Sequence, residues 1–224
     1  MKLAILGGSF NPVHNGHLFL AKQAADEYGY ERVLFIPARE PPHKTLASGA
    51  SDTDRLEMLK RALNEYGDNR FFIDDCELKR SGPSYTIDTV YDLEARYAGA
   101  LEGKIGLIIG SDLTADFSKW KNADLLADKT DIVLGRRPCL DAEKLPEGGF
   151  SAAEAGVPDK PHRAGEHSGA AGIFPRPHLR LHNEFYAVSS AAIRRMTAEK
   201  KDWKALVPAS VYGYIVERKL YGCE

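Results

Sequence analysis

Residues 2–17 read KLAILGGSFNPVHNGH, and this stretch decides the fold. Its apolar start ends at Gly7-Gly8, which predicts a buried strand over 2–6 that meets a turn. Apolar residues at helical spacing then predict a helix over 17–28, which ends at Gly29. A strand, a glycine-rich turn and a helix begin the alternation that builds a parallel sheet.

The same alternation continues along the chain. Apolar runs predict strands over 32–36, 70–74, 104–109, 131–134 and 179–182. Helical spacing predicts helices over 54–66, 84–97, 190–196 and 209–219. The predicted apolar faces include Leu56, Leu59 and Leu63, then Ile87, Val90, Tyr91 and Leu93, and finally Val211, Ile215 and Val216. This order favours an α/β fold, a doubly wound parallel sheet whose continuously apolar strands are covered on both faces.

The chain of 224 residues has room for roughly 1.5 domains. Residues 39–53 contain Pro41, Pro42 and Gly49 and are predicted to form a loop. Residues 138–177 are rich in Gly, Pro, Ala, Glu and Lys and are too long for an ordinary connection. We therefore expect one domain over 1–224, with an insertion or mobile flap outside the core at about 139–177.

Composition excludes several classes of protein. Hydrophobic residues make up 43% and charged residues 28%, which excludes collagen, a coiled coil and wholesale disorder. The net charge of −2 predicts no strong attraction to nucleic acid or an anionic membrane. Cys76, Cys139 and Cys223 lie far apart, which disfavours a disulfide framework or a cysteine zinc site. No apolar run approaches about 18 residues, so we expect a soluble cytoplasmic protein without a membrane span.

The turn after the first strand is where chemistry is expected, because ligands of open α/β sheets lie outside the carboxyl ends of the strands. Its sequence fits neither the G-x-G-x-x-G fingerprint nor the Walker loop. It ends in H-x-G-H, with His14 and His17 at a helix start, where both can donate hydrogen bonds to one phosphate. Two surface histidines beside a turn are an equal alternative for the bare pattern. A zinc pair is a weaker one, because no third ligand is obvious nearby.

The whole phrase G-G-S-F-N-P-x-H-x-G-H resembles the nucleotidyltransferase superfamily, whose members move a nucleoside monophosphate onto a phosphate or a similar acceptor. Further segments resemble, in order, those of the bacterial nicotinate-nucleotide adenylyltransferases: Pro41-Pro42-His43-Lys44, Glu77-Leu78-Lys79-Arg80, Pro83-Ser84-Tyr85-Thr86, Ile109-Gly110-Ser111-Asp112, Lys119-Trp120, Arg136-Arg137-Pro138 and Val188-Ser189-Ser190-Ala191-Ala192-Ile193-Arg194. The resemblance covers residues 1–138 and 179–222 and implies a Rossmann-like nucleotidyltransferase fold.

The resemblance implies an enzyme that transfers AMP from ATP to nicotinate mononucleotide, giving deamido-NAD and pyrophosphate in NAD biosynthesis. The acceptor phosphate would attack the α-phosphorus of ATP in line, without a covalent intermediate, and Mg²⁺ would come bound to the ATP phosphates. The partners are then these two substrates, with neither nucleic acid nor membrane, and a homo-oligomer stays open. Alternatives are a nicotinamide mononucleotide adenylyltransferase, another H-x-G-H nucleotidyltransferase, or a non-catalytic nucleotide sensor.

The resemblance also implies roles for particular residues. The catalytic residues would be His14, His17, Lys44 and Arg194. ATP would be bound by Gly8, Ser9, Phe10, His14, Gly16, His17, Gly110, Asp112, Ser189, Ile193 and Arg194. The nicotinate nucleotide would be bound by Gly7, Asn11, Lys44, Ser84, Tyr85, Thr86, Trp120 and Arg137. No side chain is expected to be dedicated to a metal.

Some of the residues assigned to phosphate also have a structural interpretation. Ser189 and Ser190 form a capping signal, which alone would explain both serines and leave Arg194 on the surface. Ala191 stands where the family has a threonine, so one hydroxyl contact to phosphate, worth about 1 kcal/mol, is missing. Lys44 follows two prolines that stiffen its loop, although a lysine on a loop is usually solvated.

The remaining assignments are open in the same way. Trp120 lies between two lysines, which favours an exposed edge, and the resemblance implies that it stacks on the pyridine ring. Thr86 and its neighbours would hold the pyridine carboxylate, which is compatible with a helix cap at Ser84. Asp112 would face the nucleotide ribose or cap the next helix. Arg137 and its arginine neighbour would point into the cleft or be solvated.

Overall fold

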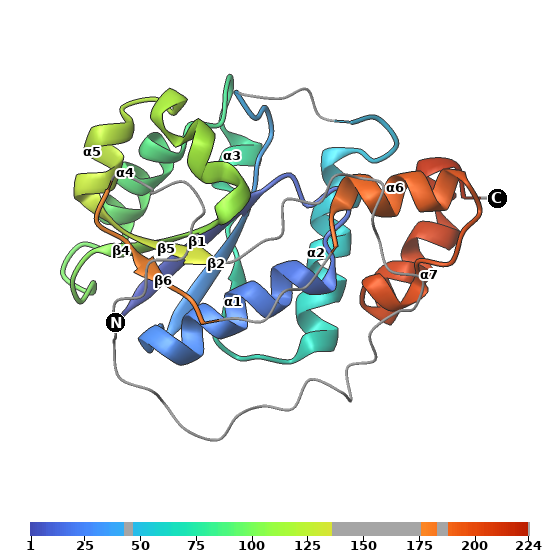
Figure 1. Cartoon of the computed structure of the whole chain (residues 1–224), viewed down its shortest axis with the longest axis horizontal. Coiled ribbons are helices and arrows are strands. Elements are labelled where there is room, and N and C mark those ends of the chain that lie inside the picture. The colour runs from blue at the N-terminus through green and yellow to red at the C-terminus, as the bar shows by residue number, and fades with distance from the viewer. Residues whose placement is uncertain (43–46, 136–175, 183–187, 224) are drawn as a thin grey trace.

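A computed structural model describes residues 1–42, 47–135, 176–182 and 188–223 (Figure 1). Its six strands are β1 (Leu3–Gly8), β2 (Arg32–Pro37), β3 (Phe71–Ile73), β4 (Ile105–Gly110), β5 (Thr130–Gly135) and β6 (Leu179–Arg180). Every neighbouring pair is parallel, in the order β3-β2-β1-β4-β5-β6. This order confirms the doubly wound parallel sheet, and it places the change of winding direction between β1 and β4.

Helices connect the strands and cover the sheet. They are α1 (Asn15–Tyr28), α2 (Asp52–Tyr66), α3 (Cys76–Lys79), α4 (Thr86–Arg96), α5 (Ala123–Lys129), α6 (Ser190–Ala198) and α7 (Ala209–Glu217). Short 3-10 helices are η1 (Ser111–Lys119), η2 (Lys204–Leu206) and η3 (Leu220–Gly222). Figure 1 shows α1 and α2 on one side of the sheet and α4 and α5 on the other. Among the described residues, no helix is both long and apolar enough to cross a membrane.

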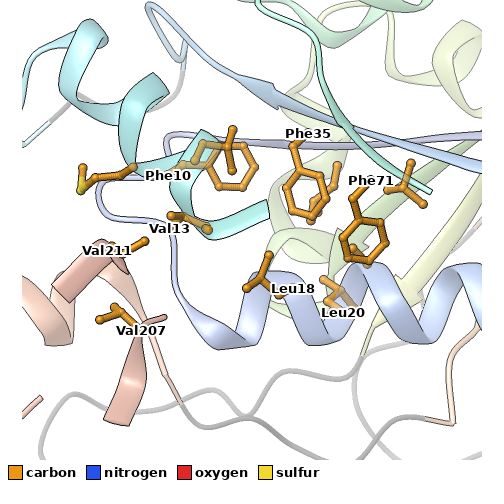
Figure 2. Close-up of a cluster of buried hydrophobic side chains, with 14 of the residues drawn as sticks. Phe10, Val13, Leu18, Leu20, Phe35, Phe71, Val207 and Val211 are labelled. Carbon is orange, nitrogen blue, oxygen red and sulfur yellow. The ribbon is translucent and has the colours of Figure 1, made fainter. Parts of the chain in front are cut away.

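The core consists of two layers, one on each face of the sheet. Along β1, Ala4 and Leu6 pack into one layer while Leu3 and Ile5 pack into the other. This alternation is the two-residue period of a strand buried on both sides. Figure 2 shows part of the first layer: Phe10, Val13, Leu18, Leu20, Phe35, Phe71, Val207 and Val211 are labelled there. The first loop and the C-terminal helices therefore share a core with α1 and β2.

The structure corrects several predicted boundaries and faces. Helix α1 begins at Asn15 rather than His17, and α2 at Asp52 rather than Asp54, because Ser51 and Asp54 form a capping box. Of the predicted face of α2, Leu59 is buried, whereas Leu56 and Leu63 are only partly buried, and the other buried residues are Asp54, Arg55, Met58 and Ala62. Tyr91 and Val216 were predicted to be core residues, but they are exposed. Residues 139–175 of the predicted insertion lie outside the described residues.

Candidate active site

The loop between β1 and α1, residues 9–14, lies at the carboxyl ends of the central strands and is called the first loop here. Two glycines beside it lie where a side chain would meet a neighbour, tightly at Gly8 and with a clash at Gly16. A Cβ at Gly8 would lie 3.2 Å from the Phe10 ring, and one at Gly16 would lie 2.9 Å from Val188 and 3.1 Å from His14. Gly7 has no such neighbour within 4 Å. The glycine pattern therefore serves to bring the first loop and the start of α1 close to other chain segments.

The two predicted histidines form a stacked pair. Their ring centroids are 3.6 Å apart with an interplanar angle of 22°. The His14 main-chain N–H donates to Nδ1 of His17 at 3.3 Å, so the neutral His17 ring carries its proton on Nε2. His14 is only 1% exposed, whereas His17 is half-buried. His17 is therefore the more accessible ring of the pair, and in this tautomer its Nε2 is the donor.

A buried arginine donates a hydrogen bond to the main chain of the first loop. Arg55 of α2 is 0% exposed, and its guanidinium donates to the carbonyl oxygens of Ser9 at 2.5 Å and Ala38 at 2.8 Å. It also pairs with Asp52 at 2.7 Å. Arg55 was not among the predicted site residues, because the predicted apolar face of α2 lies one residue further along the chain at Leu56 and Leu63. The available signal was that Arg55 precedes Met58 and Leu59 by three and four residues.

Side chains of helix α6 also donate hydrogen bonds to the main chain of the first loop. The predicted cap is confirmed, because Ser189 Oγ accepts the N–H of Ala192 at 3.1 Å. Ser190 Oγ donates to the carbonyl oxygen of Pro12 at 2.8 Å, and Arg194 Nη1 donates to that of Asn11 at 2.6 Å. The helix therefore brings Ser189 and Arg194 beside the two histidines, 170 or more residues away in sequence.

Three residues predicted to bind nucleotides have their side chains in the interior. Phe10 is 0% exposed, with its ring 5.0 Å from that of His17, and Ile193 is equally buried. The N–H of Ile193 already donates to Ser189. Asn11 is 1% exposed and both ends of its amide bond to the protein. The side chains of these residues shape the site from within rather than facing a ligand.

The carboxyl end of β4 lies beside that of β1 and forms a neighbouring part of the site. Leu6 of β1 pairs with Ile108 of β4, so Gly8 and Gly110 each lie two residues beyond a paired position. Asp112 follows in η1 and is exposed. Its predicted alternative as an N-cap is wrong, because Gly110 occupies that position. Asp112 therefore lies just beyond the carboxyl end of the central strand β4, and its side chain is exposed.

A second group of predicted residues gathers around the start of α4. Lys121 Nζ lies 4.4 Å from the Tyr85 ring centroid and 3.1 Å from the carboxylate of Asp88. This brings Trp120, which is half-buried against Phe117 at 5.3 Å, toward Tyr85 and Thr86. We call Ser84–Thr86 together with Trp120 and Lys121 the acceptor face.

The predicted cap at Ser84 is wrong, because Tyr85 occupies the N-cap position of α4. Ser84 Oγ instead accepts the main-chain N–H groups of Arg39 at 3.0 Å and Glu40 at 3.3 Å. Below it, the Glu77 carboxylate accepts the hydroxyl of Thr89 at 2.7 Å. Burial raises the pKa of Glu77, although the Thr89 hydroxyl and the nearby Arg80 oppose that shift. Glu77, the buried residue of the Glu77-to-Arg80 motif, thus supports the acceptor face from the interior.

Lys44 and Arg137 lie outside the described residues, so their predicted roles stay predictions. Within the described residues, no group of three or more His, Cys, Asp or Glu side chains is placed to hold a metal ion. The site residues near the first loop are instead hydrogen-bond donors: an imidazole, a guanidinium and two helix N-termini. Such a set suits a phosphate chain that brings its own cation.

The chain matches the cytidylyltransferase-like family over residues 5–196. A "Probable nicotinate-nucleotide adenylyltransferase" of Treponema pallidum (strain Nichols) is 35% identical over 222 residues, covering 99% of both chains. A protein of the same name from Geotalea daltonii is 35% identical over 227 residues, covering 99% of this chain and 98% of its own.

The fold is also found in a solved structure, Plasmodium falciparum nicotinic acid mononucleotide adenylyltransferase complexed with NaAD. The TM-score is 0.70 at 15% identity, covering 100% of this chain and 98% of that one. At this identity the likeness concerns the fold alone. The sequence relatives carry the assignment further, because they match at more than 30% identity from end to end. The chain therefore belongs to the cytidylyltransferase-like family and, within it, to the nicotinate-nucleotide adenylyltransferases, which are nucleotidyltransferase enzymes.

Proposed function

We propose that this chain transfers AMP from ATP to nicotinate mononucleotide, giving deamido-NAD and pyrophosphate. The observation that carries the proposal is the stacked pair of His14 and His17 at the start of α1, beside the start of α6 and Arg194. These donors meet at the change of winding direction between β1 and β4, where doubly wound sheets bind nucleotides. The names of the full-length relatives give the same substrates.

The main obstacle to this reaction is repulsion between the acceptor phosphate and the ATP phosphates. Two unit charges at 4 Å repel by about 1 kcal/mol in water and about 4 kcal/mol at an effective dielectric constant of 20. Nε2 of His17 donates to the phosphate oxygens, the helix N-termini supply main-chain N–H groups, and Arg194 adds a positive charge. Mg²⁺ enters with ATP as part of the substrate and neutralises further phosphate charge. Neither a nucleophilic side chain nor a covalent intermediate is needed.

The acceptor face supports nicotinate over nicotinamide. Trp120 offers a half-buried ring for stacking, and Thr86 is the first residue of an 11-residue helix. The N-terminus of a helix favours a carboxylate over a neutral amide, because its unpaired N–H groups carry partial positive charge. We assign Tyr85 and Thr86 to the pyridine carboxylate on this basis, and Lys44 and Arg137 stay candidates for the acceptor phosphate.

The direct test is pyrophosphate release from ATP and Mg²⁺, with nicotinate and nicotinamide mononucleotides compared side by side. We expect a strong preference for the nicotinate form, measured as kcat/KM. Preference for the nicotinamide form would keep the chemistry and overturn the acceptor assignment. ATP binding without turnover of either nucleotide would favour a different acceptor or the sensor alternative.

A further inference from the structure

The C-terminal end of the chain reaches the first loop through one buried hydrogen bond. Tyr221, in η3, donates its hydroxyl to Oδ1 of Asn11 at 2.6 Å, across 210 positions of sequence. Tyr221 is 8% exposed and Asn11 is 1% exposed, so water does not compete freely for this bond. Burial raises the pKa of Tyr221, so its hydroxyl stays protonated and a donor at neutral pH.

Asn11 connects three separate segments. Its Nδ2 donates to the carbonyl oxygen of Ala47 at 2.9 Å, and its own carbonyl oxygen accepts Arg194 at 2.6 Å. With Tyr221 on Oδ1, donor and acceptor ends of the amide are both satisfied inside the protein. The main chain of Asn11 lies three residues before His14. A displacement of Asn11 would therefore also displace the guanidinium of Arg194 and the stacked histidines.

The backbone at Tyr221 indicates that its side chain is required. Its φ of 59° and ψ of 25° lie in the left-handed region, which glycine adopts more easily than any other residue. The ring packs over Gly49, where a Cβ would lie 2.9 Å from Cδ1 of Tyr221. A tyrosine in this conformation must contribute contacts that offset its backbone strain, and the bond to Asn11 is one of them.

We propose that Tyr221 is a positioning residue for the adenylyl transfer proposed above. It fixes the amide of Asn11, and Asn11 in turn fixes the first loop and the carbonyl oxygen that holds Arg194. The proposal rests on the proposed function, since positioning is measured through that reaction. It assigns a role in catalysis to a residue that touches neither substrate, because small displacements of phosphate donors cost rate steeply.

The test compares Tyr221→Phe with Tyr214→Phe in the full-length chain. Tyr214 of α7 is also buried and also loses one hydroxyl bond, to Asp54 at 2.9 Å, but this partner belongs to α2 and not to the first loop. Steady-state kinetics use ATP, Mg²⁺ and nicotinate mononucleotide, and Tm is measured for both variants. We expect Tyr221→Phe to lower kcat about tenfold with both KM values within about twofold, and Tyr214→Phe to keep the wild-type kcat. Equal kcat values for the two variants would overturn the proposal.

A double-mutant cycle asks whether Tyr221 acts through Asn11. If it does, Tyr221→Phe costs no further activity once Asn11→Ala is present. Additive losses in kcat would show that Tyr221 acts by another route and would refute this assignment. If Asn11→Ala does not fold, the comparison with Tyr214→Phe still decides. Wild-type enzyme that releases no pyrophosphate would instead refute the proposed function.

Discussion

The two sides of the candidate site are held in different ways. In the first loop, the carbonyl oxygens of Ser9, Asn11 and Pro12 accept hydrogen bonds from Arg55, Arg194 and Ser190, respectively. In the acceptor face, Ser84 is buried and accepts two main-chain N–H groups. The segment of Trp120 and Lys121 is joined to α4 by the ion pair of Lys121 with Asp88, whose side chains are 42% and 37% exposed. An exposed ion pair contributes about 0–1 kcal/mol, whereas a buried carbonyl oxygen that loses its donor costs about 1–3 kcal/mol.

This difference matches the role proposed for each side. Stabilising charge that develops on a phosphate requires donors fixed before the reaction, because reorientation during the reaction would cost the energy they supply. Stacking on a ring tolerates small displacements, since the contact is spread over a face. We therefore expect changes near the first loop to act on kcat or stability, and changes at the acceptor face to act on KM for one substrate.

The largest effect is expected for His17→Ala. Loss of a preorganised donor to developing phosphate charge lowers kcat by about 10²–10³-fold, with far smaller changes in either KM. The matched control is His182→Ala, which removes an exposed histidine that pairs with Glu27 at 3.1 Å, well away from the first loop. An unchanged kcat in His17→Ala would remove His17 from the catalytic role.

The next effect is on stability, at Arg55→Met. The substitution leaves the carbonyl oxygens of Ser9 and Ala38, on half-buried residues, without the Arg55 donor, at a cost of about 2–3 kcal/mol in the free energy of unfolding. Arg61→Met on the same helix removes an exposed pair with Glu57 and a cation–π contact with Tyr214, and it is expected to cost about 1 kcal/mol or less. Urea denaturation of both variants is the measurement. Similar losses would mean that Arg55 is not a support of the first loop.

Arg55 also illustrates where sequence reasoning fails. The strands, the doubly wound class and the capping serine at 189 were predictable, because period and capping chemistry are local signals. Residues that bridge distant segments were not. The spacing of Arg55 to Met58 and Leu59 indicates a buried position, but nothing local shows which groups its guanidinium contacts. Nothing local distinguishes Tyr221 from a surface tyrosine. Their partners are main-chain or amide groups 46 and 210 positions away, which only the fold brings together.

The candidate site was predictable to the same extent. The H-x-G-H pattern identified His14 and His17, but not that one ring is buried while the other remains accessible. Phe10, Asn11 and Ile193 belong to the same motifs, yet their side chains point into the core. A motif records which residues the site needs and does not separate those that face the ligand from those that shape the site.

Trp120→Ala tests whether the acceptor face governs the binding of nicotinate mononucleotide. Loss of stacking, worth about 1–3 kcal/mol per base, is expected to raise KM for nicotinate mononucleotide about tenfold while KM for ATP and kcat change little. Trp120→Phe retains an aromatic face and should recover much of the loss. Equal changes in both KM values would argue against stacking on the pyridine ring and for a general effect on the fold.

The smallest effect is expected on stability, at the hydrogen bond between Tyr214 and Asp54. Asp54 precedes Arg55 on α2 and accepts the hydroxyl of Tyr214 at 2.9 Å, so this bond joins α7 to α2. Burial alone would raise the pKa of Asp54, but hydrogen bonds from Ser51 and Tyr214 outweigh it, and the pKa is lowered. A lowered carboxyl pKa stabilises the fold fully above its unfolded value, near 3.9, and this stabilisation is lost as pH falls through the folded value.

Tyr214→Phe should therefore cost about 1 kcal/mol of unfolding free energy at pH 7, and the cost should shrink as the pH falls below about 4. Urea denaturation of wild type and variant between pH 7 and pH 3 measures the difference. A difference independent of pH would mean that the hydroxyl acts by packing rather than on the Asp54 carboxylate. Because Tyr214→Phe is expected to keep the wild-type kcat at pH 7, a loss of stability at the bond between α7 and α2 can be measured separately from the positioning of the first loop.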